Sequence, residues 1–535
     1  RKHNLRMALR PRELYVILPN GKEIALSVGF EESVSAVIKT MLGHMESEAG
    51  ANYSLFSGAN VLNRRKSLRD AGVRPGDHLV LRQEVENTQT TATDETDVDI
   101  WLEPNTSEFT VYELPNAGNG AAAPTIDPST LPNNRNSHLI TSISFNKIVE
   151  RLTHPSDLDP DFLEIFLFTY RSFATAEQLL NKLIQRNNVP ATKTNAAGEQ
   201  EAVSERETDL VRVRIYVFLT QWLDRAYQDI DDLLMEKLNI WVENEVQEDR
   251  RPLLFSALNK VRTRKAATAE VIPPINIDVP GLGDKVSLLD LDPMEIARQL
   301  TFYSWTVFTG IKPMEFFDCA WSKPRLEHLA PNVLEMIARF NYISNWVATE
   351  LCREPKLRGR RTKFTKLIKV GVLLREMGNF HMLYALITGW NNSAVSRLKW
   401  TIEKLPKPTK QSMQELETLM SMEGSFKNYR ETLKRSGNTS CIPYIGILLK
   451  DLTFIEDGNP NVVNGLINWY KRRLVQSVVG EYLRSALVPS RIAPAIVNGI
   501  PINDIIKNLP QLDENGLYEA SLKAEPRGAK PEQLQ

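Results

Sequence analysis

The sequence holds few cysteines and no long apolar stretch. Only three cysteines occur in 535 residues, Cys319, Cys352 and Cys441, without C-x-x-C spacing and without a histidine at metal-ligand distance. This pattern is typical of a reducing compartment and argues against a disulfide framework. No run of about 18 apolar residues exists, so no membrane-spanning helix is predicted. We therefore expect a cytoplasmic protein without a metal site, whose contact with membranes is peripheral and made through a partner.

An excess of positive charge is also missing. The formal net charge at pH 7 is −1, and a nucleic-acid-binding surface needs Lys and Arg in excess, so no nucleic-acid partner is expected. None of the motifs G-x-x-x-x-G-K-[ST], G-x-S-x-G, H-E-x-x-H and G-x-G-x-x-G occurs. A hydrolase, kinase or dehydrogenase is thus poorly supported, and no cofactor is expected. His381, in an apolar run, is more typical of a capped or surface residue than of a catalyst.

Length and apolar content, by contrast, are ample. With 535 residues, of which 42% are hydrophobic, the chain has the size of roughly three domains. It opens on Arg1 instead of Met, so we expect a fragment of a longer protein. Residues 12–83 follow the order strand, strand, helix and short strands, with a hairpin turn at Asn20 and Gly21. This order resembles a ubiquitin-like β-grasp domain, which implies either a second protein partner or a spacer without a ligand.

The rest of the chain divides by composition. Residues 84–136 are polar, then rich in Gly, Ala, Pro and Asn, which predicts a flexible linker in which residues 99–114 add a strand or pack against a neighbour. Residues 137–270 show apolar positions at helical spacing, with an exposed loop predicted at 193–208. A Pro- and Gly-rich connector covers 271–289, and the longest helical block covers 290–528. The fold class predicted is therefore mainly α.

Residues 450–460, KDLTFIEDGNP, break a local rule. Leu449, Leu452 and Ile455 mark one face of a helix that Gly458 and the following Asn-Pro end. Glu456 and Asp457 then lie at the C-terminal end of that helix. The partial negative charge of the exposed carbonyls makes this position unfavourable by about 0.3–1 kcal/mol for each carboxylate. Sites that break a local rule are where function is expected.

Other polar residues in the helical block have ordinary structural interpretations when taken singly. Arg298 is typical of a surface or salt-bridged arginine. Asn391, together with Asn392 and Ser393, is typical of a helix N-cap cluster.

Taken in order, these stretches resemble the catalytic domain of Ras-family guanine-nucleotide exchange factors across nearly all of residues 290–528. The similarity lies in residues 293–321, 330–351, 367–401, 425–461 and 465–473. Residues 140–184 are similar to the helical N-terminal module that accompanies and braces this domain. The resemblance implies an all-helical exchange domain with a protruding helical hairpin, a helical N-terminal exchanger module and no covalent chemistry.

The implied partner is a Ras-like small GTPase, whose GDP is released when the hairpin is inserted beside the nucleotide site. The hairpin's first helix and turn fall on residues 450–460, and residues 465–483 supply the returning helix. The family's carboxylate falls on Asp457 and its magnesium-site residue on Thr453, with Glu456 as support. The stretch IEDGNP is closer to the EEGNP of Ras-directed members, so Ras is favoured over Rap.

The family's further GTPase-contacting positions fall on Arg298, Tyr384, Asn391, Phe426, Tyr444 and Lys450. Phe426 and Tyr444 are candidates for aromatic anchors of an interface, although Tyr444 also fits a buried helix-packing residue. Cys441 and Pro443 are more typical of support for the hairpin base. An exchange-inactive scaffold or GTPase-binding adaptor with the same fold is the alternative function.

Overall fold

The computed structural model describes residues 98–112, 137–156, 159–194, 200–266, 272–436, 441–484 and 492–534, and before residue 98 five strands and a few single residues. The chain divides into two compact units, Arg1–Asp97 and Val98–Gln535. The described part is mainly helical, which confirms the predicted fold class. None of the described helices is long and apolar enough to cross a membrane.

The first unit contains a five-stranded sheet in the order β2-β1-β5-β3-β4. Its strands are β1 (Glu13–Ile17), β2 (Glu23–Ser27), β3 (Asn52–Ser57), β4 (Asn60–Val61) and β5 (His78–Glu84). β1 pairs antiparallel with β2 and parallel with β5. Val16 and Leu79 are fully buried. The helix predicted between β2 and β3 lies outside the described residues apart from Val37, so the ubiquitin-like interpretation stays a prediction.

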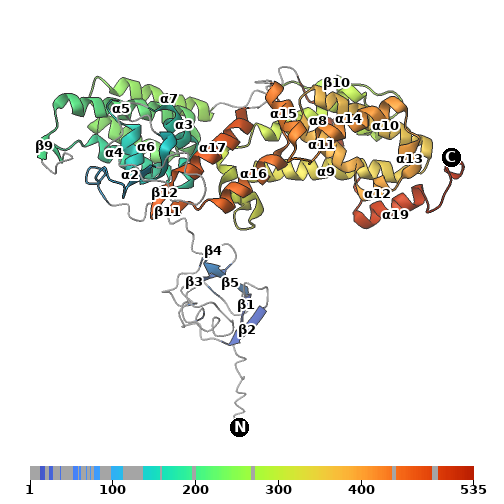
Figure 1. Ribbon diagram of the computed structural model, residues 1–535, viewed down its shortest axis with the longest axis horizontal. Helices are drawn as coiled ribbons and strands as arrows, with labels where there is room; N and C mark the ends of the chain where they lie inside the picture. The colour runs from blue at the N-terminus through green and yellow to red at the C-terminus, as the bar shows by residue number, and fades with distance from the viewer. Residues whose placement is uncertain are drawn as a thin grey trace, which may run out of the picture. The chain divides into compact units, whose positions relative to one another are not determined.

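The N-terminal half of the second unit is a helical module (Figure 1). Its helices are α2 (Phe145–Leu152), α3 (Pro160–Thr169), α4 (Ala176–Asn187), α5 (Glu205–Arg225), α6 (Asp232–Glu245) and α7 (Arg251–Ala266). Ser, Thr or Asp side chains cap the N-termini of α2 to α6. Each accepts a hydrogen bond from a backbone N–H of the first turn, which has no partner within the helix. In the predicted exposed loop, strands β8 (Thr192–Thr194) and β9 (Gln200–Ala202) form a hairpin, and α5 begins at Glu205.

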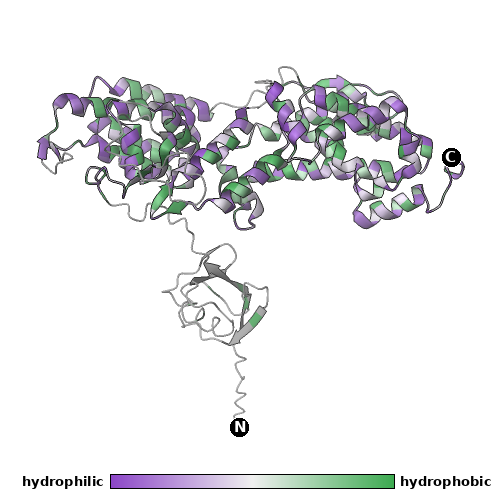
Figure 2. Cartoon of the chain, viewed as in Figure 1, coloured by the Kyte–Doolittle hydropathy of each residue, from purple (hydrophilic) through white to green (hydrophobic). Residues whose placement is uncertain are grey.

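Aromatic packing forms the core of this module. Phe166 stacks on Tyr170 with ring centroids 5.4 Å apart, and Phe218 and Trp222 contact the same pair from α5. All four side chains are buried, as the helical spacing predicted. Hydrophobic residues gather where helices face one another, and hydrophilic residues cover the outer surfaces (Figure 2).

The C-terminal half is a larger helical domain. Its helices are α8 (Pro293–Phe308), α9 (Pro331–Arg353), α10 (Leu357–Glu376), α11 (Phe380–Trp390), α12 (Ser393–Ser396), α13 (Lys399–Glu403), α14 (Lys407–Leu419), α15 (Lys427–Ser436), α16 (Ile445–Gly458), α17 (Trp469–Arg484), α18 (Ile502–Lys507) and α19 (Glu514–Ala524). α9 and α11 pack closely at Gly389, where an added Cβ would lie 2.5 Å from the Ser344 carbonyl oxygen. Only glycine permits that approach.

The predicted connector at 271–289 is part of this domain's surface. Within it, β10 (Ile275–Ile277) pairs parallel with β13 (Ala495–Val497), which pairs in turn with β14 (Ile500–Pro501). The Asn498 side chain also makes two hydrogen bonds with the backbone of Val279. It accepts one from the Val279 N–H at 2.7 Å and donates one to the Val279 carbonyl at 3.1 Å. The connector is therefore attached to the domain along its length.

A four-stranded sheet joins the two halves of the unit, in the order β11-β12-β7-β6. Its strands are β6 (Thr110–Tyr112), β7 (Ile140–Ile143), β11 (Val462–Val463) and β12 (Leu466–Asn468). Residues 98–112, within the predicted linker 84–136, fold onto the module, where Ile100 and Tyr112 are buried. They include the strand β6, in agreement with the prediction that residues 99–114 add a strand or pack against a neighbour. Next to the sheet, Phe162 of α3 stacks on Trp469 of α17 with centroids 4.2 Å apart.

Phe162→Ala should lower the free energy of unfolding by about 3–5 kcal/mol, because it removes a buried ring and leaves a cavity against Trp469. The exposed Leu233 of α6 gives the control, since Leu233→Ala should change stability by less than about 0.5 kcal/mol. Urea unfolding followed by tryptophan fluorescence measures both. Equal midpoints for the two variants would contradict the assignment of this contact.

Candidate functional site

α16 has a buried face and an exposed face. Ile445, Leu448 and Leu452 are buried in the core that α16 shares with α17, and Leu449 and Ile455 pack partly buried against it. The helix ends at Gly458, as predicted. The opposite side exposes four residues of the stretch KDLTFIEDGNP to solvent, namely Lys450, Thr453, Phe454 and Asp457.

The two acids at the end of α16 lie in different environments. Glu456 forms an ion pair with Lys471 of α17 at 2.9 Å, and the Lys471 side chain is only 2% exposed. Burial lowers the pKa of Lys471, and the Glu456 carboxylate counteracts that shift. Asp457 is exposed. Glu456 therefore stabilises the helix pair from within, while Asp457 faces outward.

A kinked segment, η7 (Pro313–Ser322), packs against the C-terminal end of α16. Asp318 and Cys319 adopt left-handed backbone angles, with φ of 54° and 52°, which non-glycine residues seldom do. Asp318 accepts a hydrogen bond of 3.0 Å from the Asn461 side chain, just beyond α16. Burial, with a further contribution from the Glu456 charge, raises the pKa of the Cys319 thiol to about 11. The thiol is therefore neutral at physiological pH.

Three of the predicted GTPase-contacting residues come together in one aromatic cluster. The ring centroid of Tyr384 lies 4.6 Å from that of Tyr444 and 5.7 Å from that of Phe426. Phe340 of α9 packs against both tyrosines. These residues come from α9, α11 and the segments before α15 and α16, so only the tertiary fold assembles them.

The members of this cluster differ in how much of each side chain is exposed to solvent. Phe426 is only 7% exposed and has a left-handed φ of 63°. It contacts the two tyrosines from the interior, and its role as an interface anchor stays a prediction. Tyr384 and Tyr444 are half-buried and present part of each ring to solvent. Burial raises the pKa of Tyr444 to about 12, so its hydroxyl stays protonated.

The remaining predicted residues lie on other elements. Arg298 is exposed on α8 and makes one ion pair, with Glu295 at 3.4 Å. Asn391 follows α11 as its exposed C-cap, whereas Asn392 caps α12 by accepting from the Ala394 amide at 2.9 Å. The N-cap interpretation therefore belongs to Asn392. The Lys450 ammonium lies 5.8 Å from the ring centroid of Phe454.

Two features near the site escaped the sequence interpretation. Phe454 is 65% exposed. The sequence could have indicated this, because Phe454 lies on the helix face opposite the apolar stripe of Leu449, Leu452 and Ile455. Arg430 of α15 donates two hydrogen bonds to the Asp451 carboxylate, at 2.9 and 2.8 Å, and so ties α15 to α16. No local pattern indicated that pair, because it joins separate helices.

His381 is not a surface residue, which corrects the prediction for it. It is fully buried, its Nε2 lies 3.2 Å from the Met336 carbonyl oxygen, and its ring packs near Phe340 and Tyr444. Burial lowers the pKa of His381 to about 4. His381 is therefore a neutral part of the floor beneath the aromatic cluster.

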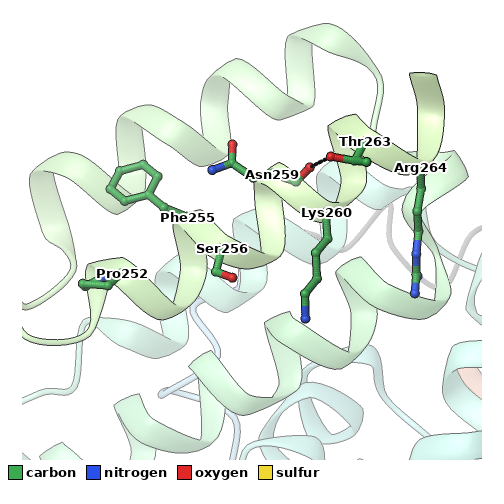
Figure 3. Close-up of a pocket in the computed structure, with 7 residues that line it drawn as sticks. All are labelled: Pro252, Phe255, Ser256, Asn259, Lys260, Thr263 and Arg264. Atoms are coloured by element: carbon green, nitrogen blue, oxygen red, sulfur yellow. Dashed lines mark hydrogen bonds between the residues drawn. The ribbon is translucent and has the colours of Figure 1, made fainter. Parts of the chain in front are cut away.

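A shallow hollow on α7 is separate from these residues (Figure 3). Its described lining comes from α7 alone, namely Pro252, Phe255, Ser256, Asn259, Lys260, Thr263 and Arg264. It contains none of the predicted site residues. We therefore place the candidate site on α16 and the adjoining aromatic cluster.

Comparison with known families identifies both halves of the second unit. Residues 295–473 match the RasGEF domain, and residues 139–241 match the RasGEF N-terminal motif. The first match contains α16 and the aromatic cluster, and the second begins at the sheet that joins the halves. The two halves of the second unit are therefore similar to the RasGEF domain and to the RasGEF N-terminal motif.

Three of the curated relatives that the chain is similar to come from Dictyostelium discoideum. Ras guanine nucleotide exchange factor A is 36% identical over 72% of this chain and 65% of its own length. Ras guanine nucleotide exchange factor J is 33% identical over 76% of this chain and 52% of its own length. Ras guanine nucleotide exchange factor I is 32% identical over 72% of this chain and 47% of its own length. The chain thus spans about half to two thirds of these relatives.

The buried His381 predicts a pH dependence of stability. Its pKa is about 4 in the folded chain and 6.5 ordinarily, so between these values the unfolded chain binds a proton that the folded chain does not. The free energy of unfolding should therefore fall as the pH drops through this window, by up to about 3 kcal/mol.

His381→Gln keeps a donor for the Met336 carbonyl and removes the titrating ring. Urea unfolding at several pH values within the window should show a flatter dependence for this variant than for the native chain. Parallel curves for the two proteins would show that another group causes the dependence.

Proposed function

We propose that this chain is a guanine-nucleotide exchange factor, which binds a Ras-like small GTPase and accelerates release of its GDP so that GTP can load. The observation that carries the proposal is the RasGEF domain match over residues 295–473. Within that match, the inner face of α16 packs into the core, and its outer face exposes Thr453, Phe454 and Asp457. The names of the relatives support the same activity for those proteins.

Exchange of this kind makes and breaks no covalent bond. The chain lowers the affinity of the GTPase for nucleotide by binding the nucleotide-free form more tightly than the loaded form. The coupling is reciprocal, so nucleotide weakens the binding of this chain by the same factor. The lack of catalytic motifs in the sequence agrees with such a mechanism.

In this proposal α16 and α17 act as a helical hairpin that enters beside the nucleotide site. The Asp457 carboxylate repels the phosphates and competes for the cationic groups that bind them. The methyl group of Thr453 crowds the magnesium site. Glu456 takes no direct part, because its ion pair with Lys471 turns it toward the interior of the helix pair.

The aromatic cluster supplies the larger part of the proposed interface. Tyr384 and Tyr444 expose part of their rings, and contacts with partly buried Phe340 and buried Phe426 fix their orientation. Rigid, partly exposed aromatic residues are typical interface anchors. Arg298, Asn391 and Lys450 add polar contacts around them.

We favour Ras over Rap because the stretch Ile455 to Pro460 is similar to that of Ras-directed exchange factors. The test is release of a fluorescent guanine nucleotide from loaded Ras and loaded Rap, with and without this chain. Faster release from Ras supports the proposal in full. Binding to the GTPase without faster release from either would support the exchange-inactive scaffold instead.

Asp457→Ala and Thr453→Glu should each slow nucleotide release by about tenfold, since coupling between two ligands is typically worth 1–3 kcal/mol. Stopped-flow fluorescence measures the rate, and circular dichroism checks that the fold is kept. Glu519→Ala is the matched control, because Glu519 is an exposed acid on α19. Rates equal to that control would remove Asp457 and Thr453 from the mechanism.

Residues 12–83 are a second element of the proposal. The order of the described strands, with β1 parallel to β5, supports a ubiquitin-like fold. We propose that this module binds another protein partner, with a spacer role as the alternative. Amide shifts in this region on adding the GTP-loaded GTPase would identify that partner. Shifts confined to residues after 98 would point to a spacer role.

A further inference from the structure

The segment Val98–Tyr112, which we call the clip, folds onto the N-terminal module although it lies outside both family matches. Glu103 is 9% exposed and accepts hydrogen bonds from the Ser144 hydroxyl and from the Asn146 side chain, the latter at 2.9 Å. Ser144 is the N-cap of α2. A carboxylate at a helix N-terminus is favourable, so Glu103 attaches the clip to the start of α2.

Trp101 attaches the clip at a second point. Its indole N–H donates to the Gln185 carbonyl at 3.1 Å, and the Arg186 guanidinium lies 3.9 Å from its ring centroid. The Lys182 ammonium donates to the Val98 carbonyl at 2.8 Å. The three contacted residues lie on α4, so the clip spans from α4 to α2.

From there the clip reaches the sheet that holds the α16–α17 pair. β6 at its end pairs with β7, and β7 pairs on its other side with β12. Ser142 and Ile143 of β7 therefore have backbone partners on both sides. β12 continues directly into α17 at Trp469.

This connection gives the clip a role in placing the proposed hairpin. Without β6, the short strand β7 would become a sheet edge, and edge strands have unpaired backbone groups and fray more easily. β12 would then pair with a less firmly held strand at the start of α17. The turn end of the hairpin would move, although every residue of its exposed face is unchanged.

We infer that the clip is a positioning element for nucleotide exchange, acting through β6, β7 and β12 on the orientation of α16 and α17. Trp101 and Glu103 are its positioning residues, and neither touches the proposed GTPase surface. The inference rests on the exchange activity proposed above.

The test compares Trp101→Ala and Glu103→Gln with Leu102→Ala in the full chain. Leu102 lies between the two positioning residues and is 75% exposed, which makes it the matched control. The two clip variants should lower kcat for nucleotide release by roughly fivefold, as expected for a coupling residue remote from the site. KM for the loaded GTPase should change less than kcat, because the contact surface is intact.

Hydrogen exchange of the backbone amides gives a second readout. Amides of β12 should exchange faster in Trp101→Ala and Glu103→Gln, while those of α9 and α11 in the domain core should keep their protection. Trp101→Phe keeps the ring beneath Arg186 and loses the bond to Gln185, so it should fall between the native chain and Trp101→Ala. A general loss of protection would indicate a merely structural role and would overturn the inference.

The two proposals fail separately in this design. If the native chain releases no nucleotide, the exchange function falls, but the β12 amides still decide whether the clip positions the hairpin. If β12 exchange and kcat in both clip variants equal those of Leu102→Ala, the clip inference is overturned while the exchange function stands. If Trp101→Ala does not fold, Glu103→Gln and Trp101→Phe decide the question.

Discussion

Backbone pairing between β7 and β12 is the constraint on which the rest of the second unit depends. These strands come from residues 140–143 and 466–468, so one short ladder joins the N-terminal module to the turn end of the α16–α17 pair. The stack of Phe162 on Trp469 adds apolar contact at the same junction. A helix that acts on a partner must be held in place, because displacement of either end moves its exposed face.

Burial assigns different roles to neighbouring side chains. Glu456 and Asp457 are adjacent acids at an unfavourable helix end, and the structure turns one toward buried Lys471 and the other toward solvent. Likewise Phe426 is enclosed while Tyr384 and Tyr444 stay half-exposed. In each case the inner residue fixes geometry and the outer residue faces the proposed partner. The cost of Asp457 at its position is small, and an outward charge is what the proposed role of Asp457 in exchange requires.

The sequence predicted the helical blocks and the stretch at residues 450–460 well, because these depend on local spacing. The apolar stripe of α16 and its end at Gly458 follow from periodicity and from Gly-Asn-Pro. The aromatic cluster could be proposed only through family resemblance, since its members lie far apart along the chain. Composition did not reveal where residues 98–112 and the connector attach, because each pairs as a strand with a segment that lies elsewhere in the sequence.

By itself, the sequence determined a mainly helical protein with an unusual acidic helix end, since helix periodicity and capping are properties of neighbouring residues. Only the tertiary structure decided which acid is ion-paired, that His381 lies buried beneath Tyr444, and that the clip shares a sheet with β12. Those features depend on burial and on pairing between distant segments. Both are set by the packing of the whole unit, so no local pattern encodes them.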